Sequence, residues 1–320
     1  MNKIAIGVDI GGTNTKIGLV DRNGKLLAST SILTQEDNVT FDDFLASLKV
    51  TLDEMISSIS IEFEIVGMGI GAPNANYYKG TIENAANLKW KGIIKVIEAL
   101  NKYYLFPTVL TNDANAAAIG EMVFGGAKEM NDFLLVTLGT GLGSGFVANG
   151  KLIYGHDGFA GELGHINVIP DGRICGCGRK GCLETYASAT GIQLTVAEFL
   201  KNSKEKSLLQ DIKEKEITSK MVFDAAEKGD KIALKAFDYT AQMLGKGLAD
   251  AVAITSPEAI FLFGGLVKAG KYILDPTKKY FEQSVMNNFQ NKVKILPSEL
   301  LDKNVAVLGA AALAWKELGG

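Results

Sequence analysis

The sequence contains few cysteines, histidines and prolines. Among 320 residues there are three cysteines, two histidines and six prolines. All three cysteines fall between Cys175 and Cys182, shortly after His165. If these thiols serve one site, none remains for a disulfide. This excludes a disulfide-stapled secreted fold and favours a reducing compartment.

Long apolar runs and an excess of positive charge are also absent. No stretch approaches the roughly 20 apolar residues that a membrane-spanning helix needs. The apolar segment at residues 1–8 runs directly into a glycine-rich turn, without the length or the flanks of a signal peptide. A formal net charge of −3 provides no general attraction for nucleic acid or an anionic membrane. We therefore expect a cytoplasmic protein that binds neither.

The composition is otherwise that of a globular protein with a large core. Apolar residues make up 47% of the chain and charged residues 22%. A chain of 320 residues is too long for one small core, and no low-complexity linker divides it. Two lobes joined by a hinge are therefore expected.

Four side chains with the chemistry of zinc ligands lie between Gly161 and Glu184. They are His165, Cys175, Cys177 and Cys182. Three thiolates and an imidazole close a tetrahedral zinc site and leave no position for water. The alternative, scattered cytosolic thiols beside a loop histidine, requires every cysteine to fall in one short segment by chance. We predict a structural zinc site flanked by two acids, Glu162 and Glu184.

A strand, a glycine-rich turn and a second strand occur twice in the chain. The first set is Lys3–Asp9, the turn at residues 11–14 and Lys16–Val20, and the second is Phe133–Leu138, residues 139–145 and Phe146–Ala148. The dinucleotide-binding motif requires a helix after its glycine-rich turn, and here a strand follows instead. The Gly-Lys-Ser/Thr of a Walker A loop is also absent. Backbone amides in such turns can approach phosphates directly. A plain hairpin remains the alternative for the first set considered alone.

The rest of the chain alternates between helical and strand patterns, which indicates an α/β fold. Helices are predicted at residues 41–59, 93–102, 114–122, 191–200, 219–227, 231–254 and 305–318, and further strands at 25–30, 65–70, 107–110, 151–154 and 260–263. The turn Gly71–Asn74 follows one of these strands, at the edge where open α/β sheets bind ligands. Asp113 follows another strand at the start of a helix. By itself it is read as a helix cap, a role that is compatible with catalysis.

Seven motifs in this order resemble one known family. They are DIGGTNTK (residues 9–16), GAPN (71–74), TNDANAAAIGE (111–121), LGTGLGSG (138–145), GELGH (161–165), CxCGxxGCxE (175–184) and FGG (263–265). The sequence resembles the ROK family of sugar kinases, repressors and open reading frames. Within it the chain is most similar to the bacterial glucokinases. The likeness runs essentially end to end.

The resemblance implies an actin-like (ribonuclease H-like) ATPase fold, with two lobes, a central cleft and a zinc-stabilised loop. The N-terminal lobe would comprise residues 1–113 and 304–320, and the C-terminal lobe residues 114–303. The implied reaction transfers the γ-phosphoryl group of ATP to the 6-hydroxyl of glucose. The cofactors would be Mg²⁺, bound with the nucleotide, and a structural Zn²⁺. The family also implies a homo-oligomer, a dimer or a tetramer.

The same resemblance assigns roles to individual residues, with Asp113 as the catalytic base. Sugar binding would fall to Gly71, Asn87, Asn112, Asp113, Glu162, His165 and Glu184. Nucleotide and its magnesium would be bound by Asp9, Gly11, Gly12, Thr13, Thr140, Gly141, Gly264 and Gly265. Zinc would be held by His165, Cys175, Cys177 and Cys182. His165 would serve both zinc and sugar, one ring nitrogen for each.

Two other functions compete with glucose phosphorylation. Repressors of this family carry a helix-turn-helix domain before the first phosphate motif, whereas Asp9 is already the ninth residue here and the charge balance is acidic. A kinase for another hexose or an N-acetylhexosamine is the nearer alternative. N-acetylglucosamine, N-acetylmannosamine, mannose, allose and fructose are its candidate substrates.

Overall fold

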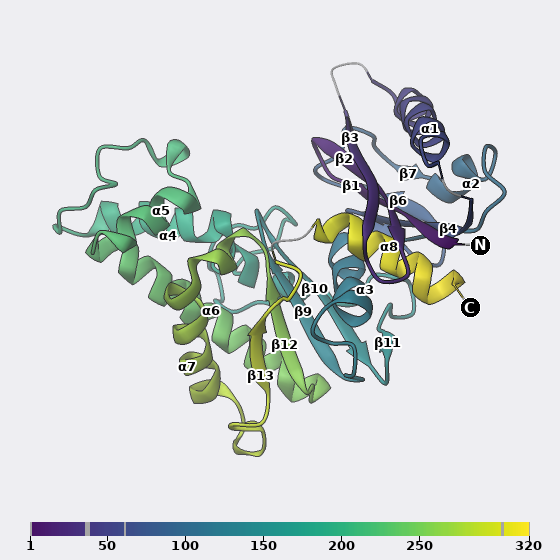
Figure 1. Cartoon of the computed structure of the whole chain (residues 1–320). Helices are drawn as coiled ribbons and strands as arrows, with labels where there is room; N and C mark the ends of the chain where they lie inside the picture. The colour runs from purple at the N-terminus through teal and green to yellow at the C-terminus, as the bar shows by residue number, and fades with distance from the viewer. Residues whose placement is uncertain (1, 36–38, 61, 302–303, 320) are drawn as a thin grey trace.

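The first of two similar five-stranded sheets is built mostly from the N-terminal third of the chain. The computed structural model describes residues 2–35, 39–60, 62–301 and 304–319, and predictions for residues 1, 36–38, 61, 302, 303 and 320 lie outside them. Figure 1 shows the two sheets side by side. The strands of the first are β1 (Asn2–Ile10), β2 (Asn14–Asp21), β3 (Leu26–Leu33), β4 (Phe63–Ala72) and β8 (Thr108–Asn112), in the order β3-β2-β1-β4-β8.

The second sheet repeats this topology. Its strands are β9 (Phe133–Leu138), β10 (Leu142–Ala148), β11 (Lys151–Leu152), β12 (Ala259–Phe263) and β13 (Lys294–Pro297), in the order β11-β10-β9-β12-β13. Each sheet begins with three antiparallel strands and adds two parallel ones beside the first strand. This duplication confirms the predicted α/β, actin-like architecture.

Helices and short strands complete the described part of the chain. The helices are α1 (Phe41–Ser57), α2 (Val96–Leu100), α3 (Asp113–Phe124), α4 (Ala189–Asn202), α5 (Ser219–Glu227), α6 (Lys231–Thr255), α7 (Leu274–Ser284) and α8 (Val305–Leu318). A small sheet contains β5 (Ala75–Asn76), β6 (Thr81–Glu83) and β7 (Ile93–Ile94). The 3₁₀ turns are η1 (Leu163–His165), η2 (Leu183–Thr185), η3 (Glu214–Glu216), η4 (Gly265–Tyr272) and η5 (Asn287–Phe289).

Three apolar cores stack across the molecule. One joins α1 to the first sheet, and another joins α4, α5, α6 and α7 to the second sheet. Between them α3 and α8 pack against each other, and each covers the inner face of one sheet (Figure 1). The two helices approach closely because both are glycine at the contact: a Cβ on Gly120 would lie only 2.9 Å from Cα of Gly309. The C-terminal helix thereby returns to the first sheet.

Several predicted elements differ from the structure. The helix predicted at residues 93–102 is wrong in its first turn, because residues 93–94 pair with β6 and only Val96–Leu100 is helical. Strand β10 begins at Leu142, four residues earlier than predicted, since residues 142–145 of the glycine-rich segment already pair with β9. The strand at residues 294–297 and the small sheet were not predicted. Strands of two to four residues carry too little periodicity to be recognised.

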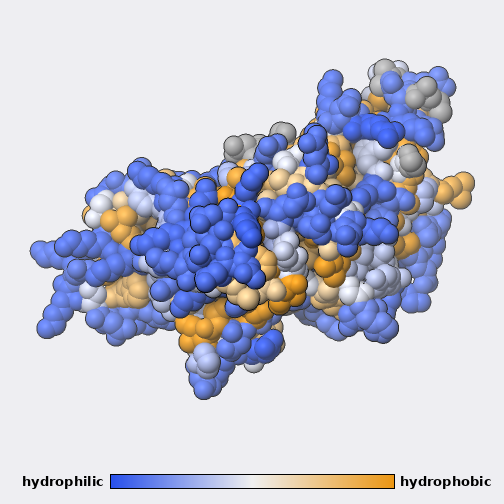
Figure 2. Space-filling view, turned by 90° about the horizontal axis from the view of Figure 1, so that it is seen from below, coloured by the Kyte–Doolittle hydropathy of each residue, from blue (hydrophilic) through white to orange (hydrophobic). Residues whose placement is uncertain are grey.

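The surface in Figure 2 is mostly hydrophilic, as the composition of a globular protein predicts. In the face that Figure 2 shows, hydrophilic residues predominate and hydrophobic ones form separate patches. Apolar atoms are a normal part of any protein surface. Among the described helices, none is both long enough and apolar enough to cross a bilayer.

Candidate active site

Two carboxylates meet at the C-terminal edge of the first sheet. Strands β1, β4 and β8 are parallel, and their register aligns Asp9 with Gly71 and Gly71 with Thr111, so that Asp113 follows at the same edge. Gly71 leaves room between the two acids. A Cβ at this position would lie 3.9 Å from Oδ1 of Asp9 and 3.7 Å from Cα of Asp113. The register of the parallel strands thus places Asp9 and Asp113 at the same edge of the sheet.

Helix α3 begins at the second of these acids, but its cap is the preceding residue. The Asn112 side chain accepts a hydrogen bond from the Ala114 amide at 2.9 Å and is the N-cap, so the reading of Asp113 as the cap is wrong. Asp113 is the first helical residue, and its Oδ1 accepts from the same amide at 2.8 Å. The helix therefore does not depend on the Asp113 carboxylate alone for its start.

Like charges accumulate around Asp113. Burial, and then the nearby Asp113, raise the pKa of Asp9 to about 6, while the facing Lys16 opposes that shift. Desolvation by the surrounding protein raises the pKa of Asp113 too, partly offset by the hydrogen bond from the Ala114 amide, although the residue is exposed. Glu162 has a raised pKa through desolvation and the charges of Asp113 and Glu184, which His165 partly offsets. Such a group of acids attracts cations and polar hydroxyl ligands.

The first glycine-rich turn is fixed from two sides. The Gly11 amide donates to the Asn14 carbonyl at 3.1 Å, and the Thr34 amide donates to the Thr13 carbonyl at 2.9 Å. The loop that carries Asn87 packs against the turn, since a Cβ on Gly12 would lie 2.9 Å from the Asn87 carbonyl oxygen. The predicted nucleotide turn and a predicted sugar ligand are therefore neighbours.

The second turn, at residues 139–141, lies against the candidate zinc loop, which comprises residues 161–184. It connects β9 to β10, and Gly139 donates to the Gly141 carbonyl at 3.1 Å while Thr140 is exposed. Oε2 of Glu184 accepts from the Leu142 amide at 3.3 Å, and Oε1 accepts from the Cys175 thiol at 3.0 Å. Glu184 thus joins the second turn to the cysteine cluster.

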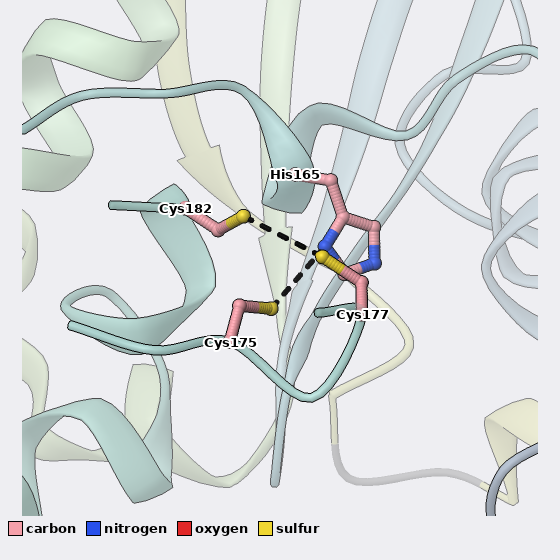
Figure 3. Close-up of side chains that lie close together, drawn as sticks. All are labelled: His165, Cys175, Cys177 and Cys182. Atoms are coloured by element: carbon pink, nitrogen blue, oxygen red, sulfur yellow. Dashed lines mark hydrogen bonds between the residues drawn. The ribbon is translucent and has the colours of Figure 1, made fainter. Parts of the chain in front are cut away.

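The four predicted zinc ligands converge on one point, as Figure 3 shows. The ligand atoms of His165, Cys175, Cys177 and Cys182 all lie within 4.8 Å of one another. Sγ of Cys177 is 3.7 Å from Sγ of Cys182, and Sγ of Cys175 is 3.6 Å from Nδ1 of His165. Tetrahedral zinc with bonds of about 2.3 Å to sulfur and 2.0–2.1 Å to nitrogen requires separations of about 3.8 Å and 3.6 Å. The residues fit a zinc ion.

His165 presents its two ring nitrogens to different neighbours. Nδ1 points into the cysteine cluster, whereas Nε2 lies 3.8 Å from Oε2 of Glu162. One ring nitrogen thus faces the predicted metal position, and the other faces a carboxylate. Metal-bound histidines commonly use the second ring nitrogen for a polar partner, which fixes the tautomer and the orientation of the ring.

The remaining predicted nucleotide residues lie at the end of β12. Gly264 has a φ of +110° and begins the turn into η4, while Gly265 borders a mostly apolar cavity of about 350 Å³. Phe223, Phe237 and Leu266 line this cavity. His156, predicted to be an ordinary loop residue, is exposed in the loop after β11.

Three residues of the site were not singled out from the sequence. Ser144 donates to the Gly161 carbonyl and accepts from the Leu163 amide at 3.2 Å, which fixes both sides of Glu162. Arg173 donates to the carbonyls of Thr185 and Gly191 and to Glu198, and its guanidinium lies over the Tyr186 ring at 4.5 Å. Gln35 bonds to the first turn. Ser144 belongs to a quoted motif, so its position could have indicated a role.

Comparison with known proteins identifies the family. The model of the ROK family matches residues 5–317. The chain belongs to the ROK family. A glucokinase from Halalkalibacterium halodurans is 38% identical over 87% of this chain and 84% of its own length.

Two solved structures of the ROK family have closely similar folds. A glucokinase from Streptomyces griseus, in complex with glucose and AMPPNP, is 33% identical with a TM-score of 0.81, and the match covers 98% of this chain and 99% of that one. A ROK family transcriptional regulator, a homologue of the E. coli MLC protein, has a TM-score of 0.88 at 26% identity over 99% of this chain and 79% of that one. Kinases and regulators therefore share this fold, and site chemistry must distinguish them.

Proposed function

We propose that this protein is a cytoplasmic, ATP-dependent glucokinase that transfers the γ-phosphoryl group to the 6-hydroxyl of glucose. The observation that carries the proposal is the position of Asp113 between two groups of residues. On one side are Asp9 and the first glycine-rich turn, and on the other are Glu162 and His165 of the zinc loop. The similarity to glucokinases named above supports the same activity.

Asp113 is the proposed general base. Phosphoryl transfer needs positioning, charge neutralisation and a carboxylate beside the attacking hydroxyl. Asp113 is exposed, and as the first residue of α3 it lies at the positive end of the helix dipole, which favours its ionised form. It would accept the proton of the 6-hydroxyl as that oxygen attacks the γ-phosphorus and ADP leaves.

Sugar hydroxyls would be bound by amides, carboxylates and one imidazole. The proposed ligands are Asn87, Asn112, Glu162, His165 and Glu184, with the backbone at Gly71 beside them. Because Oδ1 of Asn112 caps α3, its Nδ2 remains the atom for a sugar oxygen. Ionised carboxylates only accept hydrogen bonds, so Glu162 and Glu184 would each accept a hydrogen bond from a sugar hydroxyl.

The nucleotide would lie across both glycine-rich turns. Gly11, Gly12 and Thr13 would bind phosphates from the first lobe, and Thr140 and Gly141 from the second. Asp9 would hold Mg²⁺, which neutralises charge on the transferring phosphates. The apolar cavity beside Gly265 has the chemistry to accept an adenine ring.

Zinc would have a structural role in this site. The four side chains of the cluster would supply all four ligands of a tetrahedral ion, so no open position would remain for a substrate. We expect the ion to fix the His165 ring and the loop that ends at Glu184. A homo-oligomer without affinity for nucleic acid, and a lobe boundary near Asp113, complete the proposal.

A coupled ATP assay over a panel of hexoses and N-acetylhexosamines tests this function. We expect glucose to have the highest kcat/KM. Mannose and the acetylated sugars differ from glucose at the 2-position. The space around that position would therefore decide which of these sugars the site accepts. A higher kcat/KM for N-acetylglucosamine or N-acetylmannosamine would refute glucose as the substrate, and no turnover of any sugar would refute the kinase assignment.

A further inference from the structure

Gln35 lies where the first glycine-rich turn and the Asn87 loop meet. It follows β3, on the edge of the first sheet, and its side chain is half-buried. Nε2 donates to the Gly12 carbonyl and, at 3.0 Å, to the Asn87 carbonyl. Oε1 accepts from the Lys89 amide. Both ends of one amide are thus used to join two segments.

The backbone around Gln35 is fixed by its neighbour. Thr34 is buried, and its amide donates to the Thr13 carbonyl at 2.9 Å. Its hydroxyl lies 2.9 Å from the hydroxyl of Thr15, which is also buried. These contacts hold Gln35 beside the turn, so the orientation of its side chain does not depend on a free loop.

Each of the two joined segments also has anchors of its own. The turn is closed by the bond between Gly11 and Asn14. The Asn87 loop is fixed to the core by Leu88 and Trp90, and the Trp90 ring lies 4.7 Å from that of Phe44. Each segment is therefore held in place by contacts that do not involve Gln35. Gln35 adds hydrogen bonds that fix the position of the turn relative to the Asn87 loop.

We propose that Gln35 is a positioning residue that couples nucleotide binding to sugar binding. It fixes Asn87, a proposed sugar ligand, against the turn proposed to bind the ATP phosphates, so a ligand that orders one segment orders the other. This inference rests on the proposed function. Because coupling between two ligands is reciprocal, glucose and nucleotide should each raise the affinity for the other by the same factor.

Calorimetric titration of the full chain tests the coupling. Glucose affinity is measured with and without AMPPNP and magnesium, in wild type, Gln35→Met and Gln35→Glu. Methionine keeps the length of the side chain and loses every hydrogen bond. Glutamate keeps the acceptor for Lys89 but turns a carboxylate toward two carbonyl oxygens. Gln283→Met, on the exposed side of α7, is the matched control.

We expect AMPPNP to tighten glucose binding at least about 5-fold in wild type and in the control, the low end of common coupling factors. In Gln35→Met and Gln35→Glu the factor should fall below about 2. KM for glucose should rise about 3- to 10-fold as Asn87 loses its support, while the melting temperature and the affinity for AMPPNP alone change little.

The outcomes separate this inference from the function on which it rests. Wild-type protein that phosphorylates no sugar would overturn the proposed function, and the role of Gln35 with it. Wild-type kinase activity with an unchanged coupling factor in both variants would overturn the role of Gln35 alone. So would the absence of any coupling in an active wild type.

Discussion

Asp9 and Asp113 show what the site demands of single residues. Two carboxylates at one sheet edge repel each other, and the surrounding protein further disfavours their charged forms. Without ligands this arrangement is destabilising, and a bound divalent cation relieves it. Electrostatic repulsion of this kind is expected in a site that binds a magnesium nucleotide.

The first prediction is that Asp9→Asn stabilises the protein in the absence of magnesium and nucleotide. The wild-type carboxyl has a folded-state pKa of about 6 against an ordinary 3.8. Its contribution to stability is therefore complete below pH 4 and is lost as the pH rises through 6. At pH 8 the variant should be about 1–3 kcal/mol more stable than wild type, with the difference vanishing near pH 4.

Urea unfolding at a series of pH values measures this difference. Asp250→Asn, at an exposed position on α6, is the control and should show no such trend. A gain in stability for Asp9→Asn that does not vary with pH would contradict the electrostatic explanation.

Residues with local signals could be predicted, and residues with distant partners could not. The candidate zinc ligands were recognisable because cysteine is rare here and all three cysteines lie between Cys175 and Cys182. Gln35 carries no such signal, because its partners are 23, 52 and 54 positions away. Nor did the sequence separate the cap at Asn112 from the acid at Asp113, since both residue types cap helices.

At the level of elements, the zinc loop is the part whose integrity the sugar site should depend on most. The loop presents His165 at one end and Glu184 at the other, and Glu184 also contacts the second glycine-rich turn. Arg173 secures the loop to α4 independently of any metal. Loss of zinc should therefore disturb the ends of the loop more than its attachment to the core.

The second prediction concerns Cys177→Ala. Cys177 is the exposed thiol of the three, so its removal deletes a zinc ligand without opening a cavity in the core. We expect zinc content to fall and the glucose dissociation constant to rise about 10-fold or more, because metal and its oriented neighbours act together. Metal analysis, calorimetry and thermal melting measure the three quantities.

Lys180→Ala, an exposed change in the same loop, is the control and should retain zinc and glucose binding. A Cys177→Ala protein that has lost zinc but binds glucose with wild-type affinity would refute the structural role proposed for the ion.

Elements with strong local patterns were predictable, and very short ones were not. Helix α1 begins at Phe41 as expected because Thr40 and Asp43 form a capping box before an apolar face. The two glycine-turn hairpins were recognised from turn chemistry alone. The small sheet of β5, β6 and β7 was missed, and its pairing changed residues 93–94 from predicted helix to strand.

On the scale of the whole molecule, two copies of one topology face each other across α3 and α8. The first copy carries Asp9 and Gly71 near the C-terminal ends of β1 and β4, and the second copy carries the second turn, which contacts Glu184 of the zinc loop. Asp113 begins the helix between the two sheets. If the two halves close on their ligands, closure would exclude water from the γ-phosphate beside this residue.

The central claim is that Asp113 is the base of a glucose kinase, and Asp113→Asn tests it most directly. Asn112 caps α3 and an asparagine at 113 can still accept from Ala114, so the fold should persist. We expect glucose affinity by calorimetry to stay within about 3-fold of wild type while kcat falls by at least about 100-fold. Turnover near the wild-type rate in a folded, glucose-binding Asp113→Asn protein would contradict the account.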